Sequence, residues 1–366
     1  MRKLLWLASA MLVCLGLIGC SGSEPDVKNT QPSSETSSAD TAQREPTAQS
    51  DQAQTTGSEP EALTGKVVVY MPSPAGLADK LAAGFQAATG IKVEQFQGTT
   101  GEILARLEAE AANPVADVVI LASWADGLSL KNAGKLLSYA PANSDKVYPT
   151  WKDDGNFIFG TSASAVGVIY NTTIFPQVSA DWAELADEKY KDQLAIPDPE
   201  KSGSCKDFLS GYLNNKGETE GWAVWESLAA NGMTVPGANA AALEAVTTGS
   251  KGILVAGVDY NAYSSKAKGE PVDIYYPAGG TVINPRPAMI LKTSPNVGNA
   301  KAFMDYLLSN DAQNLVAKAY LLPGRNDITS PNRANVSDIP VLVTDWDWMV
   351  ANAGAIAKKL NTICAK

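Results

Sequence analysis

The chain has 366 residues, 45% of them hydrophobic, which is enough for two domains with proper cores. Its 29 Lys and Arg against 39 Asp and Glu give a formal net charge of −10, which disfavours nucleic acid as a partner. The chain has no histidine, so a Ser–His–Asp triad, a histidine base and a histidine metal ligand are all excluded. Most common hydrolase and metalloenzyme mechanisms are therefore excluded for this chain. We predict that it holds no metal and no cofactor.

The N-terminus has the features of a secretion signal. Arg2 and Lys3 precede an apolar run over 4–18, which is too short to span about 30 Å of hydrocarbon as a stable helix. The tetrapeptide Leu-Ile-Gly-Cys at 17–20 resembles a bacterial lipobox, in which the cysteine becomes the diacylated N-terminus; an ordinary signal peptide is the alternative. We expect residues 1–20 to be a lipoprotein signal peptide and Cys20 to carry the lipid, with acyl chains such as palmitate.

Residues 21–64 are predicted to be a disordered linker. They contain no aromatic residue and are dominated by Ser, Thr, Gln, Glu and Pro, so they cannot bury enough apolar surface to offset the entropy of ordering. A flexible chain of this length reaches roughly 35 Å. It suits a tether that holds a globular body off a membrane.

The body begins as an alternation of strands and helices. Apolar runs predict strands over 66–71, 91–96 and 117–121. Apolar residues at helical spacing predict helices over 77–89, which Gly90 follows, and over 102–112. This order is typical of an α/β fold with a parallel sheet, whose ligands lie at the carboxyl ends of the strands.

The second half predicts two lobes. Two segments, near residues 160 and 280, have the length and composition of strands that cross between lobes. We expect lobe 1 to comprise 65–160 and 278–366, and lobe 2 to comprise 161–277. The other expected strands and helices are strands over 157–170, 192–196, 253–258, 274–277 and 287–291, and helices over 220–230, 240–247 and 297–309.

Small hydroxyl residues follow several of the strand-like runs. In the segment 97–102, Thr99 has the spacing to cap a helix while Glu102 reaches back to it, and such a helix start also suits an anion. The segment 202–204, ahead of a helical stretch over 205–212, repeats this chemistry. A helix start and nothing more is the alternative reading for each. The predicted anion-binding residues are Ser73, Thr99, Thr100, Gly101, Ser162, Ser202, Gly203 and Ser204.

Asp259 and Tyr260 follow a buried strand, where an acid needs a cation, a hydrogen-bond donor or water. We expect them to hold a ligand amine, sugar hydroxyls or a metal, or to lie on an exposed loop. Arg286 stands between two prolines and has two possible partners, a bound anion or a carboxylate of a lobe. Cys205 and Cys364 remain once the signal and the anchor are set aside, and they form either one disulfide or two buried thiols.

Several segments together resemble one protein family. They are the run Gly-Thr-Thr-Gly-Glu-Ile-Leu-Ala-Arg-Leu-Glu-Ala-Glu at 98–110 with 113–118, and the segments 167–172, 198–204 and 300–313. In this order they are similar to bacterial extracellular solute-binding proteins, in the branch with the ferric-iron, 2-aminoethylphosphonate and hexose-phosphate binders of ABC importers. The resemblance covers 66–325. It implies a two-lobed type II periplasmic-binding fold, with mixed sheets joined by a two-segment hinge, and delivery of a solute to a membrane permease and its ATPase.

The expected class of solute depends on the iron ligands of the family, which this sequence lacks at the corresponding segment. Ferric members bind iron through adjacent tyrosines, often with a histidine and an acid, whereas 258–263 reads Val-Asp-Tyr-Asn-Ala-Tyr. The adjacent pair Tyr275-Tyr276 lies in the second crossing segment instead. We therefore expect a phosphonate or sugar phosphate, with Asp259 selecting its amine or hydroxyl end, and keep ferric iron as the alternative.

Other classes are weighed against this hypothesis. The segment 160–164 resembles Gly-x-Ser-x-Gly but lacks the last glycine, and 265–268 fits Ser-x-x-Lys without companion motifs, so we predict no enzyme. A sensor or adhesin lipoprotein on the same fold is a further alternative. We expect an exported monomer, attached to the membrane only by its lipid, on the periplasmic or cell-surface side.

Overall fold

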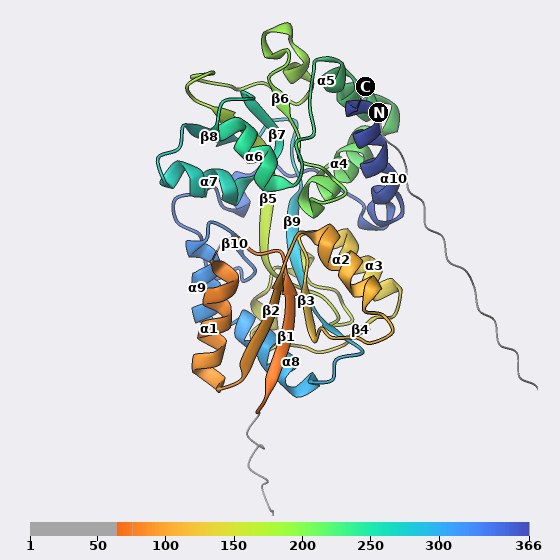
Figure 1. Cartoon of the computed structure of the whole chain (residues 1–366), viewed down its shortest axis with the longest axis vertical. Coiled ribbons are helices and arrows are strands. Elements are labelled where there is room, and N and C mark those ends of the chain that lie inside the picture. Colours follow the sequence, from red (N-terminus) through yellow and green to blue (C-terminus); the bar gives the residue numbers. More distant parts are fainter. Residues whose placement is uncertain (1–63, 75, 366) are drawn as a thin grey trace, which may run out of the picture. The chain divides into compact units, whose positions relative to one another are not determined.

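The computed structural model describes residues 64–74 and 76–365, and these residues belong to one compact unit (Figure 1). The predicted signal peptide, Cys20 and all of the predicted linker except residue 64 lie outside the described residues. None of the helices in the described part is long and apolar enough to cross a membrane.

The described residues form ten strands. These are β1 (Lys66–Met71), β2 (Lys92–Gln97), β3 (Val118–Ile120), β4 (Leu136–Leu137), β5 (Phe159–Asn171), β6 (Leu194–Ala195), β7 (Ile253–Val258), β8 (Val272–Tyr275), β9 (Ile283–Leu291) and β10 (Leu322–Pro323).

They also form ten α-helices and five short 3-10 helices. The α-helices are α1 (Leu77–Thr89), α2 (Thr100–Ala109), α3 (Trp124–Asn132), α4 (Gly203–Lys216), α5 (Glu218–Ala230), α6 (Asn239–Thr247), α7 (Asp259–Ala267), α8 (Val297–Leu307), α9 (Asn310–Lys318) and α10 (Trp346–Cys364). The 3-10 helices are η1 (Ser144–Lys146), η2 (Pro149–Trp151), η3 (Ala183–Ala186), η4 (Glu188–Tyr190) and η5 (Val336–Asp338).

One mixed sheet joins all the strands in the order β2-β1-β3-β9-β5-β7-β6, with β4 beside β9 and with β8 and β10 beside β5. The strands β2, β1 and β3 are parallel, as the sequence predicts. β9 is antiparallel to both β3 and β5, and β7 is antiparallel to β5. β6 runs parallel to β7.

The long strand β5 belongs to two parts of this sheet. Its residues 159–165 pair with β9 and β10, while 166–171 pair with β7 and β8. Every residue of β5 and of β9 is buried. In Figure 1 these two strands run side by side between the elements drawn below and above them. They correspond to the two crossing segments that the sequence predicts.

Both faces of β1 are covered, which explains its unbroken apolar run. Val67, Val69 and Met71 belong to one core cluster, together with Phe85 of α1 and Phe303 of α8. The alternate residues of β1 join a second cluster with residues of α2 and α3. A strand of a parallel sheet that is buried on both faces needs no polar alternation.

Some element boundaries differ from the predictions. The helix predicted over 102–112 runs as α2 over Thr100–Ala109, because its cap at Thr99 starts it two residues earlier. The helix predicted over 297–309 ends at Leu307, and Ser309 then caps α9. The strand predicted over 287–291 begins at Ile283, ahead of two prolines that β9 accommodates.

Helix α10 packs against α4 and α5, and it also contacts α3. It comes from the C-terminal segment that the sequence assigns to lobe 1, whereas α4 and α5 come from 161–277. The last helix therefore covers elements from both predicted lobes.

Candidate functional site

Six of the predicted site residues line one cavity of about 440 Å³ at the N-termini of α2 and α4. They are Ser73, Thr99, Thr100, Ser202, Gly203 and Tyr260. The rest of the wall consists of Pro72, Pro74, Gly98, Glu102, Ala122, Lys201, Ala238, Asn239, Ala240 and Asn261. We call this cavity the hydroxyl pocket.

Thr99 caps α2 in the capping box that the sequence predicts. Its side-chain oxygen accepts a hydrogen bond from the Glu102 N–H at 3.2 Å, and the Glu102 carboxylate accepts one from the Thr99 N–H at 2.7 Å. The Thr99 hydroxyl thus serves the helix as an acceptor, and its own proton is left for a ligand oxygen. The partial positive charge at the start of a helix favours an anion there.

Thr100 and Ser204 are both buried, and both contact Ala122. The Thr100 Oγ1 accepts a hydrogen bond from the Ala122 N–H at 3.1 Å, and the Ser204 hydroxyl donates to the Ala122 carbonyl at 3.4 Å. Ser204 is 1% exposed and does not line the pocket. Its observed contact is therefore a structural one that joins the start of α4 to the end of β3.

Ser202 caps α4 and is held from two sides. Its side-chain oxygen accepts from the Cys205 N–H at 3.2 Å, and its hydroxyl donates to Asn239 Oδ1 at 2.8 Å. Because its proton is already engaged, Ser202 presents oxygen lone pairs and the backbone of α4 to the pocket. Thr99 is the better hydrogen-bond donor of the two caps.

Two glycines allow the helix starts to approach one another. A Cβ atom on Gly101 would lie 2.6 Å from the Glu200 carbonyl oxygen, and one on Gly203 would lie 2.9 Å from the Ser123 Cβ. Ser123 caps α3. The backbones at the starts of α2, α3 and α4 therefore lie close together, and this is the structural role of Gly101, which does not itself line the pocket.

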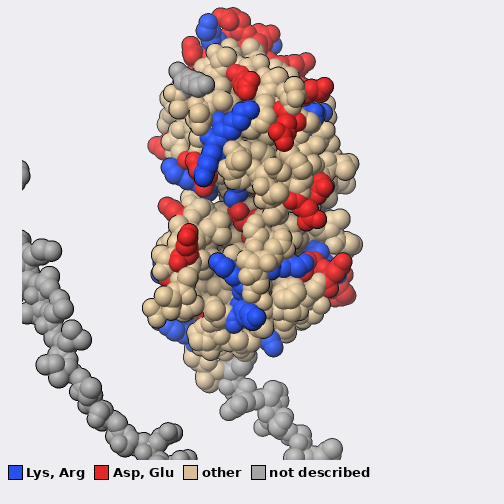
Figure 2. Space-filling view, turned by 90° about the vertical axis from the view of Figure 1, so that its right-hand side faces the viewer, with Lys and Arg blue, Asp and Glu red and all other residues tan. Residues whose placement is uncertain are grey.

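A second cavity of about 350 Å³ adjoins the hydroxyl pocket. It shares Pro74, Tyr260 and Asn261 with that pocket. Its wall also carries three lysines, one each from α1, α7 and α9: Lys80, Lys268 and Lys318. This positive charge is local, since the chain carries a net charge of −10 and Figure 2 shows Lys and Arg interspersed with Asp and Glu on the face it draws.

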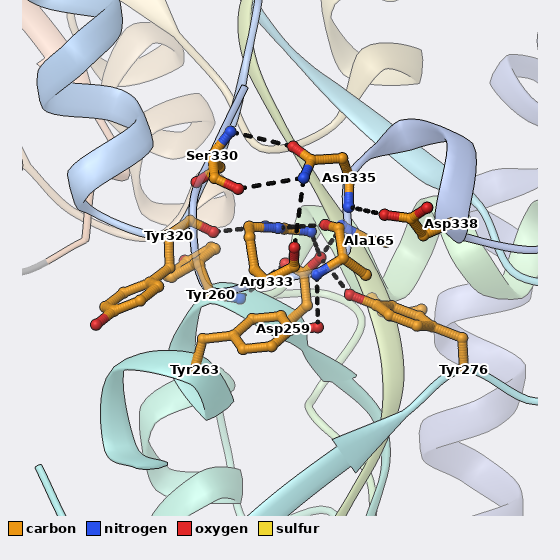
Figure 3. A network of polar contacts seen from close by, with 12 residues as sticks. Ala165, Asp259, Tyr260, Tyr263, Tyr276, Tyr320, Ser330, Arg333, Asn335 and Asp338 are labelled. Carbon is orange, nitrogen blue, oxygen red and sulfur yellow. Dashed lines mark hydrogen bonds and ion pairs between the residues drawn. The ribbon is translucent and has the colours of Figure 1, made fainter. Parts of the chain in front are cut away.

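Asp259 lies at the first turn of α7 and is completely buried (Figure 3). Its Oδ2 pairs with Arg333 Nη2 at 2.5 Å and also accepts from the Ala165 N–H at 2.9 Å and the Tyr276 hydroxyl at 3.1 Å. Its Oδ1 accepts from the Tyr260 N–H at 2.7 Å. The carboxylate is fully engaged within the protein and does not line the hydroxyl pocket. The expected role of Asp259 in selecting a ligand amine or hydroxyl does not fit this arrangement.

The tyrosines near Asp259 are disfavoured as tyrosinates. Burial, followed by the charge of Asp259, raises the pKa of Tyr276. Burial also raises the pKa of Tyr260, although the Arg286 guanidinium opposes it. Tyr263 stacks on Tyr320, and its hydroxyl accepts from the Ala334 N–H at 3.2 Å. Ferric iron prefers anionic oxygen ligands, so these raised pKa values oppose an iron site here.

Ser162 lies on β5 and does not line the hydroxyl pocket. With Ser73, Thr161 and Arg286 it lines a small cavity of about 20 Å³. Arg286 is 2% exposed and forms no ion pair within the described part of the chain. Of the two partners that the sequence left open for it, a lobe carboxylate is therefore not the one observed.

Cys205 and Cys364 are both free thiols. Cys205 is buried and donates to the Pro197 carbonyl at 3.3 Å, and its burial raises the pKa of the thiol well above the ordinary value. Burial raises the pKa of the half-buried Cys364 thiol to about 11. Of the two alternatives, the structure has the thiols.

Three residues of this region could not be found from the sequence. Asn239 holds the cap of α4, Arg333 neutralises Asp259, and Lys201 lies on the pocket wall. Each is an ordinary polar residue with no local motif, and Asn239 and Arg333 act on partners distant in the sequence. No group of three or more Cys, Asp or Glu side chains is placed to hold a metal ion within residues 64–74 and 76–365.

The sheet order and the paired crossing strands define the type II periplasmic-binding fold, as predicted. A solved structure of the periplasmic binding protein AfuA from Actinobacillus pleuropneumoniae, with fructose 6-phosphate bound, matches with a TM-score of 0.72. The match covers 81% of this chain and 97% of that chain at 23% sequence identity. At this identity the likeness establishes the fold alone.

The family is also established. Residues 113–352 match the family model described as "Bacterial extracellular solute-binding protein", and the chain belongs to this family, as the resemblance predicted. It is 27% identical over 256 residues to the "Iron uptake protein A1" of Synechocystis sp., covering 66% of this chain and 70% of that protein. It is also 27% identical over 253 residues to the "Putative 2-aminoethylphosphonate-binding periplasmic protein" of Salmonella typhimurium, covering 67% and 73%.

Proposed function

We propose that this protein is the solute-binding component of an ABC importer and that its solute is a small organic anion with a phosphonate or phosphate group. The observation that carries the proposal is the hydroxyl pocket, where the N-termini of α2 and α4 and the donor hydroxyl of Thr99 meet. Three lysines line the adjoining cavity. The Salmonella relative, whose name refers to 2-aminoethylphosphonate, and the sugar-phosphate complex of AfuA support this class of solute.

In this proposal the chain works as two lobes, 65–160 with 278–366 and 161–277, joined by β5 and β9. The solute binds at the helix starts of one lobe and completes its contacts with the other, which shifts the hinge equilibrium toward a closed form. A permease that docks on the closed form then receives only loaded protein. The protein is exported, is held at the membrane only by lipid on Cys20, acts as a monomer and performs no turnover.

Ferric iron is the second candidate, and two observations favour it. The Synechocystis relative is named for iron uptake. Four tyrosines, Tyr260, Tyr263, Tyr276 and Tyr320, lie around Asp259 and Arg333 in Figure 3. The engaged Asp259 carboxylate and the raised pKa values of Tyr260 and Tyr276 argue against it, so we place the organic anion first.

The test is a thermal-shift and calorimetric titration of the protein after it has been unfolded and refolded to remove carried-over solute. The probes are 2-aminoethylphosphonate, fructose 6-phosphate, inorganic phosphate and ferric citrate. A ligand at a concentration of about 100 times its Kd raises the free energy of unfolding by roughly 2.7 kcal/mol. We expect one of the organic anions to bind stoichiometrically without being consumed, and Thr99→Ala to weaken it about tenfold. The exposed Thr362→Ala on α10 is the matched control. Binding of ferric citrate alone, with a tyrosinate charge-transfer band, would contradict the proposal.

A further inference from the structure

The two crossing strands carry four polar side chains on one face. Ser162 lies opposite Arg286, and Ser164 lies opposite Asn284, in the antiparallel pairing of β5 and β9. Directly paired residues and alternate residues along a strand point to the same face of a sheet. All four residues are at most 6% exposed. We call this set the hinge polar face.

Three atoms of the hinge polar face have no hydrogen-bond partner within the described part of the chain. They are Ser164 Oγ, Asn284 Oδ1 and Arg286 Nη1. An unpaired polar group in a protein interior is costly, and a buried guanidinium without a carboxylate is more so. Three such atoms lie on adjacent cross-strand pairs. They point to one missing partner that hydrogen-bonds to all of them.

The hinge polar face lies next to the hydroxyl pocket. Ser73 lines both the hydroxyl pocket and the small cavity at Arg286. The guanidinium of Arg286 lies 5.9 Å from the ring of Tyr260, which also lines the hydroxyl pocket. Asn284 Nδ2 donates to the Ser204 carbonyl at 3.5 Å, in the first turn of α4. Ser73 and Tyr260 thus separate the pocket from Arg286 by the thickness of one side chain.

The cavity at Arg286 is about the size of one water molecule. It accommodates one oxygen atom of an acidic group whose remaining atoms stay in the hydroxyl pocket. The other Arg286 terminal nitrogen, Nη2, donates to the Pro72 carbonyl, which fixes the guanidinium in place. The free Nη1 is then presented to the cavity by a rigid side chain.

We propose that the hinge polar face determines which solute binds. Arg286 Nη1 and Ser73 bind one oxygen of the solute's acidic group, and Asn284 Oδ1 accepts a hydrogen bond from a hydroxyl or ammonium group of the same molecule. Arg286 and Asn284 lie two residues apart on the same face of β9, so one solute molecule carries both the acidic group and the donor. This inference rests on the proposed function and names the residues that read the two ends of the solute.

The test compares Arg286→Gln, Arg286→Lys and Asn284→Ala with the wild-type protein, each stripped of carried-over solute. The exposed Arg106→Gln, whose side chain pairs with Glu110 on α2, is the matched control. Calorimetry measures affinities for 2-aminoethylphosphonate, fructose 6-phosphate, methylphosphonate and ferric citrate. Methylphosphonate has the acidic group but no hydroxyl or ammonium donor.

We expect Arg286→Gln to lose about 100-fold in affinity for every anion that the wild type binds, and Arg286→Lys to lose less. Asn284→Ala loses about tenfold for the two probes that carry a donor and keeps its affinity for methylphosphonate. The unfolding midpoint of ligand-free Arg286→Gln stays the same or rises, because an unpaired buried charge is removed. A purely structural arginine would lower that midpoint and leave the affinity of the folded variant for each anion unchanged.

The outcomes separate the two proposals. If the wild type binds an organic anion and Arg286→Gln binds it within threefold of wild type, the inference is overturned and the proposed function stands. If the wild type binds ferric citrate but none of the anions, the proposed solute class fails, and the inference fails with it. Circular dichroism shows whether each variant is folded. If Arg286→Gln does not fold, Arg286→Lys provides the test.

Discussion

Asp207 makes the stability of this protein depend on pH. It lies in α4 and is completely buried, and its carboxylate accepts from the Ser123 hydroxyl at 2.7 Å and the Trp124 N–H at 2.8 Å. Burial, followed by the negative charge of Asp126, raises its pKa from 3.8 to about 7, against the opposing effects of its hydrogen bonds and Lys206. The carboxyl group therefore binds its proton more tightly in the folded chain than in the unfolded chain.

The sign of the effect follows from this difference. Between about pH 4 and pH 7 the folded state binds more protons than the unfolded state, so the free energy of unfolding falls as the pH rises. The stabilising contribution is complete below pH 4 and is lost as the pH rises through 7. A pKa difference of about 3 units corresponds to about 4 kcal/mol, of which more than half is lost between pH 5 and pH 8.

The perturbation is Asp207→Asn, which keeps the shape and removes the titration. Urea unfolding at pH 5 and pH 8 gives the change in unfolding free energy for each variant. We expect the wild type to lose about 2–3 kcal/mol more than Asp207→Asn over this range. The exposed Asp154→Asn, the matched control, should behave as the wild type does. Equal pH dependence in the wild type and Asp207→Asn would refute the reasoning.

Two further substitutions test the packing around the site. Asp259→Asn should destabilise the protein by about 3–5 kcal/mol in urea unfolding, because it leaves Arg333 charged and buried without its partner. Asp273→Asn in the exposed pair with Lys266 should cost less than about 1 kcal/mol, and equal losses in the two variants would contradict this. Gly101→Ala should cost about 1–3 kcal/mol and weaken solute binding, because its Cβ would meet the Glu200 carbonyl. Gly354→Ala on the open side of α10 should be neutral or stabilising by up to about 1 kcal/mol, so a harmless Gly101→Ala would show that the loops adjust freely.

Local chemistry was enough to predict the elements from β1 to β3. The helix α1 has the predicted bounds because its buried residues Leu77, Leu81 and Phe85 recur at helical spacing and Gly90 ends it with a left-handed conformation. The cap at Thr99 also depends only on neighbouring residues. Helix α7 was not predicted, because its polar sequence shows no apolar stripe and its preceding residue, Val258, supplies no side-chain cap.

The candidate site was predictable only in part, for the same reason. The hydroxyl residues of the helix starts are local signals, and the sheet topology brings most of them together. The role of Asp259 was not predictable, because Arg333 follows it by 74 residues and no pattern in either segment indicates the pair. A buried acid in a sequence has the same appearance whether its partner is a ligand or a distant arginine.

Several contacts between the two predicted lobes are polar, whereas α10 covers α4 and α5 with apolar residues. Asp207 of α4 binds the start of α3, and Lys206 pairs with Asp126 at 2.7 Å next to it. Asp259 of α7 pairs with Arg333 from the segment after β10. Polar groups that separate regain hydrogen bonds to water, so opening such an interface costs far less than exposing an apolar core of equal area. In the proposed function the strands β5 and β9 keep the lobes connected, and a bound solute shifts the balance between open and closed forms.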